Sequence, residues 1–184
     1  MNKSGKQTLE LEEVARRLNG IGVQWAVFAG AAATAYGVDR PITDIDILVP
    51  AVEGERVARV FPGAKIRQRE DGAVWVISLA GYDILAGLNQ VDLDCEMSKR
   101  LKHIKVENVK VPVISVEDNI ALKALRGRGA SEGKRDWKDV EEMVRVVRSV
   151  DWEYLYWRLE QLESKEQVAK VLERLEEMKA KYVL

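Results

Sequence analysis

The alternation of apolar and polar positions along the chain predicts a protein of the α/β class. Short apolar or alternating runs indicate strands, and apolar residues spaced three and four apart indicate amphipathic helices. The runs that predict strands span 23–28, 44–49, 65–70, 73–80, 82–86, 104–106 and 110–114. The stretches that predict helices span 8–19, 30–37, 52–61, 115–125, 135–147, 151–163 and 164–182. Strand signals fill the earlier part of the chain, and the last part is helical.

These patterns suggest three parts in a chain of 184 residues. We expect a flexible N-terminus at 1–8, an α/β core at 9–115 and a C-terminal helical region at 116–184. The length suits one domain with a small appendage. The last two helices are amphipathic, so they could also mediate a homodimer or a contact with a partner protein.

Composition narrows the cellular setting and the class of partner. Basic and acidic residues nearly balance, 29 against 30, which argues against a broad polybasic surface for nucleic acid but leaves room for a local basic patch. The single cysteine, Cys95, cannot form an internal disulfide and fits a reducing compartment. The sequence has no long apolar run and no secretory signal, so we expect a cytoplasmic protein without a membrane partner.

The stretch 25–49 carries the candidate chemistry. An apolar strand turns at Ala29-Gly30 into a short helix, and the chain returns as a strand that carries Asp44 and Asp46. Since side chains alternate between the faces of a strand, these two carboxylates point the same way. Two carboxylates side by side repel each other unless a positive charge compensates them. Mg2+, which prefers carboxylate oxygens, is a natural partner. The helix that opens at Gly30 would present backbone N–H groups to an anion such as phosphate.

This combination resembles the DNA polymerase β-like nucleotidyltransferase superfamily, in particular its small stand-alone members, some of which occur in toxin–antitoxin systems. The shared signature is an apolar residue, a Gly-Gly or Gly-Ser turn, a short helix and an Asp-apolar-Asp strand, here Asp44-Ile45-Asp46. Arg40 and Thr43 match residues that many small members carry before the first aspartate. The chain departs from the signature at Ala29, which replaces the first glycine, and this puts catalytic activity in doubt.

The resemblance implies a nucleotidyltransferase-like mixed β-sheet with flanking helices. It also implies that Asp44, Asp46 and a third acidic residue on a neighbouring strand, Asp83, hold one or two Mg2+ ions, for which Mn2+ could substitute. Asp83 would serve as general base as well, and the alternative for it is an edge-strand aspartate that faces water. The residues expected at the nucleotide are Ala29, Gly30, Arg40, Thr43 and Lys123.

Two charged segments have more than one interpretation. The three acidic residues of 91–96 alternate with apolar ones and would share one face of a strand. They could form a metal cluster, or they could belong to a solvated strand face or a loop. The glycine-rich basic segment 126–134 could close over a polyphosphate or an RNA backbone, or it could be a solvated connector. Asp136 could hold Lys123 or an arginine of that segment.

The implied function is transfer of a nucleoside monophosphate from a nucleoside triphosphate to a hydroxyl group of RNA, protein or a small molecule. The alternative is a nucleotidyltransferase-like protein with weak or no turnover that binds a nucleotide or a partner, as in a toxin–antitoxin pair. A third interpretation is a helical adaptor built on residues 150–184, in which the aspartates are ordinary surface residues.

Overall fold

A computed structural model of the chain describes residues 10–68, 75–87 and 92–182. Within these residues, seven strands form one sheet. The strands are β1 (Ala26–Phe28), β2 (Ile45–Val49), β3 (Lys65–Gln68), β4 (Trp75–Leu79), β5 (Tyr82–Ala86), β6 (Lys102–Val106) and β7 (Val109–Val113). The predicted N-terminal segment and the turn expected between β3 and β4 lie outside the described residues.

The sheet is mixed and has the strand order β3-β4-β5-β2-β1-β7-β6. The pairs β2·β5 and β1·β7 are parallel, and the other neighbouring strands are antiparallel. The predicted α/β class with a mixed sheet is therefore confirmed. The hairpin between β6 and β7 turns at Glu107 and Asn108, whose φ angles of 48° and 74° suit a tight two-residue turn.

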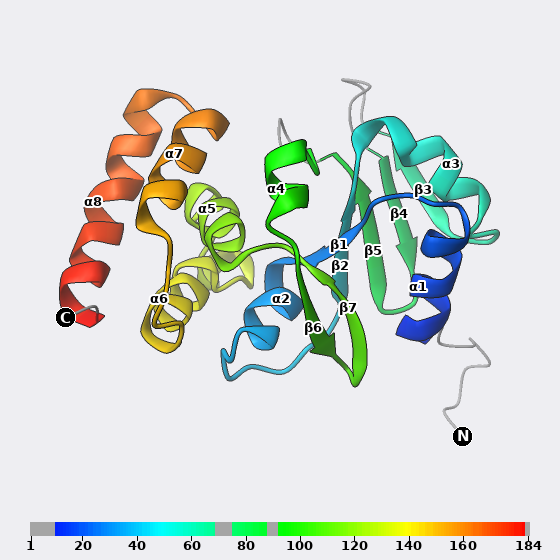
Figure 1. Cartoon of the computed structure of the whole chain (residues 1–184), viewed down its shortest axis with the longest axis horizontal. Helices are drawn as coiled ribbons and strands as arrows, with labels where there is room; N and C mark the ends of the chain where they lie inside the picture. Colours follow the sequence, from blue (N-terminus) through cyan, green and yellow to red (C-terminus); the bar gives the residue numbers. More distant parts are fainter. Residues whose placement is uncertain (1–9, 69–74, 88–91, 183–184) are drawn as a thin grey trace.

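The helices pack on the two sides of this sheet. They are α1 (Leu11–Gly20), α2 (Ala29–Ala35), α3 (Gly54–Arg59), α4 (Cys95–Lys99), α5 (Val116–Arg126), α6 (Asp136–Val146), α7 (Trp152–Leu162) and α8 (Lys165–Tyr182). Figure 1 shows α5 to α8 gathered on one side of the molecule and α1 with α3 on the other. None of the helices in the described ranges combines the length and the apolar character needed to cross a membrane.

Local sequence explains where the site-bearing helices begin and end. Ser115 Oγ accepts a hydrogen bond from Asp118 N–H (3.1 Å) and so caps the start of α5, as the sequence predicts. Gly127 ends α5 in the left-handed conformation at φ 55°, which glycine adopts without steric cost. The helix expected over 52–61 is shorter than predicted, because a 3-10 turn (Ala51–Glu53) precedes α3.

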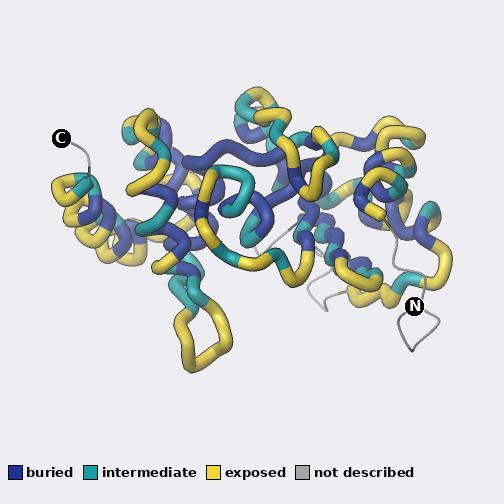
Figure 2. Tube along the Cα trace, turned by 90° about the horizontal axis from the view of Figure 1, so that it is seen from below, coloured by how far each residue is buried: buried dark blue, intermediate teal, exposed yellow. Residues whose placement is uncertain are grey.

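Both faces of the sheet are buried, and alternation along β2 assigns each side chain to a layer. Ile45, Ile47 and Val49 belong to an apolar cluster with α1 and α3. Leu48 belongs to a second cluster, to which α5, α6, α7 and α8 contribute. Figure 2 shows buried residues running through the middle of the molecule, with exposed residues around them. Asp46 has the same parity as Leu48, so it points towards the helical layer.

Of the interpretations considered for 91–96, the shared strand face is wrong for the described residues 92–96. A helix, α4, begins at Cys95, because Asp94 caps it by accepting a hydrogen bond from Met97 N–H at 2.8 Å. Asp92 accepts a hydrogen bond from Ala51 N–H, also at 2.8 Å. These carboxylates stabilise local backbone, and they do not share one face of a strand.

Candidate active site

Two adjacent parallel strands bring the predicted carboxylates together. Asp46 of β2 and Asp83 of β5 are direct neighbours in the register, so their side chains leave the same face of the sheet. Neighbouring strands are about 4.8 Å apart, which places the two carboxylates within mutual reach. Asp44 lies one residue before β2. All three carboxylates line one pocket with a volume of about 430 Å³.

The pKa of Asp46 is raised by its surroundings. Burial, together with the nearby carboxylates of Asp44 and Asp83, raises the pKa of Asp46 from 3.8 to about 6. Thr43 Oγ1 donates a hydrogen bond to Asp44 Oδ1 at 2.8 Å, which orients that carboxylate. In the part of the chain that the structure describes, no three His, Cys, Asp or Glu side chains are grouped closely enough to hold a metal ion as they stand. A bound cation would have to draw the carboxylates together.

The turn between β1 and α2 is strained at one residue and fixed by another. Ala29 adopts φ 55°, in the left-handed region that an alanine side chain disfavours. Asn119 of α5 holds this residue from both sides, since its Oδ1 accepts from Ala29 N–H (2.8 Å) and its Nδ2 donates to Ala29 O (3.1 Å). Asn119 is fully buried, and it did not emerge from the sequence as a site residue. The signal that the sequence offered was the position of Asn119, one helical turn before Lys123.

We expect Ala29→Gly to stabilise the protein by about 1 kcal/mol, because glycine removes the strain of the left-handed conformation. For a domain of this size, that change corresponds to a rise in Tm of about 2–4 °C. Ala35→Gly, at the other end of α2, is the matched control and should lower stability by about 0.5–1 kcal/mol. A thermal melt in which Ala29→Gly is no more stable than the native chain would argue against strain at this turn.

Gly30 provides room for a cation over the turn. A Cβ atom at Gly30 would lie 3.2 Å from Cζ and Nη2 of Arg40, so the guanidinium rests directly against the backbone here. Arg40 Nη1 in turn pairs with Asp139 Oδ2 at 2.6 Å. The glycine of the motif is therefore explained by close packing against Arg40 as well as by access for a ligand.

Asp136, at the start of α6, pairs with two cations of the pocket. Lys123 Nζ lies 3.2 Å from Asp136 Oδ1, and Arg128 Nε lies 2.8 Å from Asp136 Oδ2. Burial acts to raise the pKa of Asp136, but the hydrogen bond from Arg128 and the charge of Lys123 outweigh it and hold that pKa below its ordinary value. The predicted pairing of Asp136 with Lys123 or a loop arginine is confirmed for both partners.

Asp139 is the second hub of this network, and sequence reasoning missed it. Its carboxylate is fully buried and pairs with Lys123 Nζ (2.8 Å), Arg40 Nη1 (2.6 Å) and Arg135 Nε (2.8 Å). Residues three apart on a helix share a face, so the spacing from Asp136 to Asp139 was a usable signal. The two aspartates together position one lysine and three arginines around the pocket.

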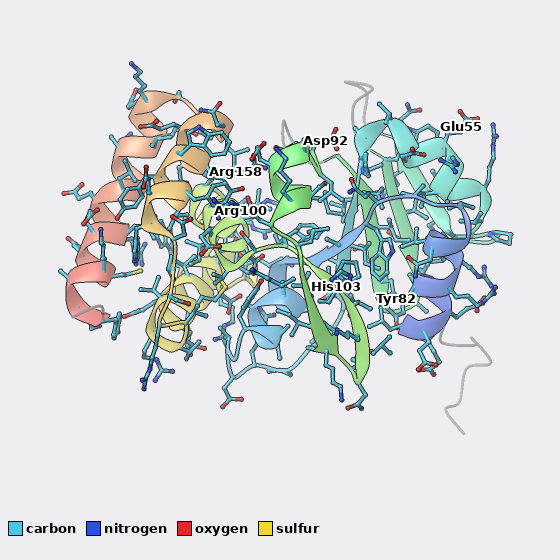
Figure 3. All side chains as sticks on the ribbon, viewed as in Figure 1. Glu55, Tyr82, Asp92, Arg100, His103 and Arg158 are labelled. Carbon is cyan, nitrogen blue, oxygen red and sulfur yellow. The ribbon has the colours of Figure 1, made fainter. Side chains whose placement is uncertain are left out.

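The pocket brings together every residue that the sequence predicts for the site. Besides the three carboxylates, its lining includes Ala29, Gly30, Arg40, Thr43 and Lys123. The rest of the lining comes from the end of α5, the segment between α5 and α6 and the first residue of α6, and consists of Arg126, Arg128, Gly133, Lys134, Arg135 and Asp136. His103 on β6 and Asp92 near α4 (Figure 3) do not line it. The lining thus has an anionic part with the three carboxylates, called here the carboxylate wall, and a part rich in lysine and arginine, called here the cationic wall.

Comparisons with known proteins identify the fold. No protein-family model matches the sequence, and no curated protein matches it. Three of the similar solved structures are a proposed nucleotidyltransferase from Thermotoga maritima, the lincosamide adenylyltransferase LnuA with bound lincomycin, and ANT(2'')-Ia with adenylyl-2''-tobramycin.

The similarity to these structures extends over most of each chain but is low in sequence. The Thermotoga maritima protein is 18% identical over 75% of this chain and 99% of its own, with a TM-score of 0.51. LnuA is 16% identical over 77% and 100% (TM-score 0.51), and ANT(2'')-Ia is 11% identical over 90% and 96% (TM-score 0.55). The chain therefore has the nucleotidyltransferase-like fold, as the sequence motifs suggested.

Proposed function

We propose that this protein is a metal-dependent nucleotidyltransferase, which moves a nucleoside monophosphate from a nucleoside triphosphate to a hydroxyl acceptor. The observation that carries the proposal is the register of Asp46 opposite Asp83 on adjacent parallel strands. With Asp44 they form the carboxylate wall of a pocket that is also lined by lysine and arginine side chains. A metal–triphosphate complex is complementary to this pocket, because the metal would bind the carboxylates and the triphosphate would bind the lysine and arginine side chains.

The donor set fits Mg2+, with Mn2+ as a substitute, since both favour carboxylate oxygens. Burial and the repulsion by Asp44 and Asp83 raise the pKa of Asp46, and a divalent cation at these carboxylates would relieve the repulsion. When bound, one or two such ions would supply Lewis-acid activation of the phosphate and lower the pKa of the acceptor hydroxyl. Asp44, Asp46 and Asp83 are the residues that would hold them.

The chain's own groups would perform the rest of the reaction. Asp83 accepts the proton of the acceptor hydroxyl, whose oxygen attacks the α-phosphorus. The bond between the α-phosphorus and the oxygen that bridges to the β-phosphorus breaks, and pyrophosphate leaves with the bonding electrons. The cationic wall compensates the charge that gathers on the leaving group, which is the main electrostatic contribution that such a site can make. Ala29 and Gly30 bring backbone close to the nucleotide.

The acceptor is proposed only as a class. LnuA and ANT(2'')-Ia are antibiotic adenylyltransferase structures in complex with lincomycin and an adenylylated tobramycin, so a small hydroxylated molecule is one acceptor to test. RNA and protein hydroxyls are the others. Pairing of the amphipathic helices α7 and α8 with a second copy or a partner stays a prediction.

The strained Ala29 favours a second candidate function, namely nucleotide or partner binding with little turnover, as in a component of a toxin–antitoxin pair. The left-handed φ of 55° is compatible with glycine and costly for alanine, so the turn is not in its optimal form. A large gain of transfer activity in Ala29→Gly would mark the native protein as catalytically impaired. An unchanged rate would favour full activity with alanine.

Label transfer tests the proposed function directly. The protein would be incubated with each nucleoside triphosphate labelled at the α-phosphate, with Mg2+ or with EDTA, in the presence of RNA, protein extract or hydroxylated antibiotics. We expect metal-dependent label on one acceptor class. Absence of label with every acceptor, while nucleotides still raise the Tm, would favour the binding function, since a ligand of the native state stabilises it.

A further inference from the structure

The cations of the pocket fall into two groups according to whether a carboxylate already neutralises them. Four are ion-paired to Asp136 or Asp139, at distances between 2.6 and 3.2 Å. They are Arg40, Lys123, Arg128 and Arg135. Lys123, the lysine expected at the phosphates, is 5% exposed and contacts both aspartates. Most of the charge of this group is already balanced by buried partners.

Arg126 and Lys134 form the second group. Among the residues that the structure describes, neither has a carboxylate within ion-pair distance, although both line the pocket. Arg126 ends α5 and Lys134 lies in the segment before α6, and the pocket that they line is the one lined by Asp44, Asp46 and Asp83. These two residues therefore carry positive charge that no described carboxylate balances.

The segment that joins Arg126 to Lys134 has a well-defined backbone. Gly127 follows Arg126 and Gly133 precedes Lys134, and both glycines adopt the left-handed conformation, with φ 55° and 65°. Lys134 N–H donates to Gly129 O at 3.0 Å, and Asp136 N–H donates to Arg128 O at 3.1 Å. The chain is thus closed into a compact loop. Arg126 precedes this loop in the chain, and Lys134 closes it.

We infer that Arg126 and Lys134 bind the polyphosphate tail of the nucleotide, and that Lys123 and Arg40 mainly position the cationic wall. The inference rests on the proposed function and assigns its phosphate contacts. A charge-assisted hydrogen bond is strongest for a donor whose charge is not already used by a protein partner. Burial and the neighbouring Arg128 also lower the pKa of the Arg126 guanidinium, although Asp136 and Asp46 act in the opposite direction. A bound polyphosphate supplies the missing counter-charge.

The test uses inorganic tripolyphosphate in EDTA, so that neither metal binding nor catalysis contributes. Calorimetry on the full chain should show that Arg126→Gln and Lys134→Gln each weaken binding at least tenfold, which corresponds to the loss of about one charge-assisted hydrogen bond. Their Tm values without ligand should stay within a few degrees of the native value. Lys138→Gln, which removes an exposed lysine of α6 outside the pocket, is the matched control and should bind normally.

Lys123→Gln separates the inference from the simple expectation that this lysine is the phosphate ligand. We expect it to lower the Tm strongly, because it leaves Asp136 and Asp139 short of a partner, and to weaken tripolyphosphate binding less than Arg126→Gln does. Binding that is lost in folded Lys123→Gln but kept in both Arg126→Gln and Lys134→Gln would overturn the inference.

A short RNA without a triphosphate end distinguishes the source of the phosphate. If Arg126→Gln and Lys134→Gln weaken RNA binding but leave tripolyphosphate binding intact, the two cations serve an acceptor backbone, and the inference is wrong. Loss of tripolyphosphate binding in both variants, in a protein that transfers no label, would keep the inference and remove the proposed function. If the protein transfers label and both variants bind tripolyphosphate normally, the proposed function stands and the inference is wrong.

Discussion

Asp46→Asn should lower nucleotidyl transfer at least 100-fold, which corresponds to about 3 kcal/mol of lost transition-state stabilisation. Asp46 lies at the centre of the carboxylate wall, next to Asp83 in the strand register and two residues from Asp44. Asparagine keeps the shape of the side chain but removes the charge that a divalent cation needs. The rate of label transfer at saturating Mg2+ measures the effect.

The same substitution should make the metal-free protein more stable at pH 8. The pKa of Asp46 is raised in the folded chain to about 6, because of burial and repulsion by Asp44 and Asp83. A raised folded-state pKa means that stability falls as the pH rises through about 6 and the carboxylate ionises. Asparagine avoids this loss, so in EDTA the variant should melt a few degrees above the native protein at pH 8, and the difference should shrink below pH 4.

Asp39→Asn is the matched control for both measurements, because Asp39 is an exposed aspartate in the same segment that does not line the pocket. It should leave the transfer rate and the metal-free Tm nearly unchanged. If Asp46→Asn transferred label as fast as Asp39→Asn, the carboxylate wall would not be the catalytic site.

Asp139→Asn should destabilise the protein by about 3–5 kcal/mol, and lower its Tm by roughly 10 °C. The carboxylate is fully buried and pairs with Lys123, Arg40 and Arg135, so its neutralisation would leave three neighbouring cations short of counter-charge. Urea unfolding at pH 7 measures the free energy of unfolding.

Glu166→Gln provides the comparison with an ordinary surface pair. Glu166 and Lys170 lie 3.0 Å apart on α8, with side chains that are 83% and 73% exposed. Its removal should cost less than 1 kcal/mol, because solvent screens such pairs. If Asp139→Asn cost no more than Glu166→Gln, the network of Asp136 and Asp139 would not stabilise the pocket.

The sequence predicted the strands of the sheet from local patterns, and most residues of the pocket from the family resemblance. Strand alternation at 44–49 already orients Asp44 and Asp46, and the apolar neighbours of Asp83 identify its strand. The parallel register that sets Asp83 beside Asp46 is a long-range pairing, for which the family resemblance stood in. The motif residues then met in one pocket.

The residues that the sequence did not reveal act through contacts between distant segments. Asn119 holds Ala29 across 90 positions, and Asp139 holds Arg40 across 99. Arg158 of α7 (Figure 3) is 2% exposed and pairs with Asp94 Oδ2 at 2.6 Å. Polar residues of this kind look like surface residues until the fold places their partners.

The helix α4 was not predicted from the sequence, and the reason is local. Alternation of acidic and apolar residues favoured a strand, whereas Asp94 also has the side chain of a good helix cap. In the structure the capping hydrogen bond to Met97 N–H is formed, and α4 follows. Two local signals competed, and the short helix was the one compatible with burial of Met97.

A crystal structure with Mn2+ and a non-hydrolysable triphosphate, α,β-methylene-ATP, would test the central claim most directly, because the anomalous signal of manganese locates the metal without assumptions. We expect a manganese peak at the carboxylates of Asp46 and Asp83, with the polyphosphate extending towards Arg126 and Lys134. Nucleotide and manganese bound elsewhere, with these aspartates free of metal at saturating concentrations, would contradict it.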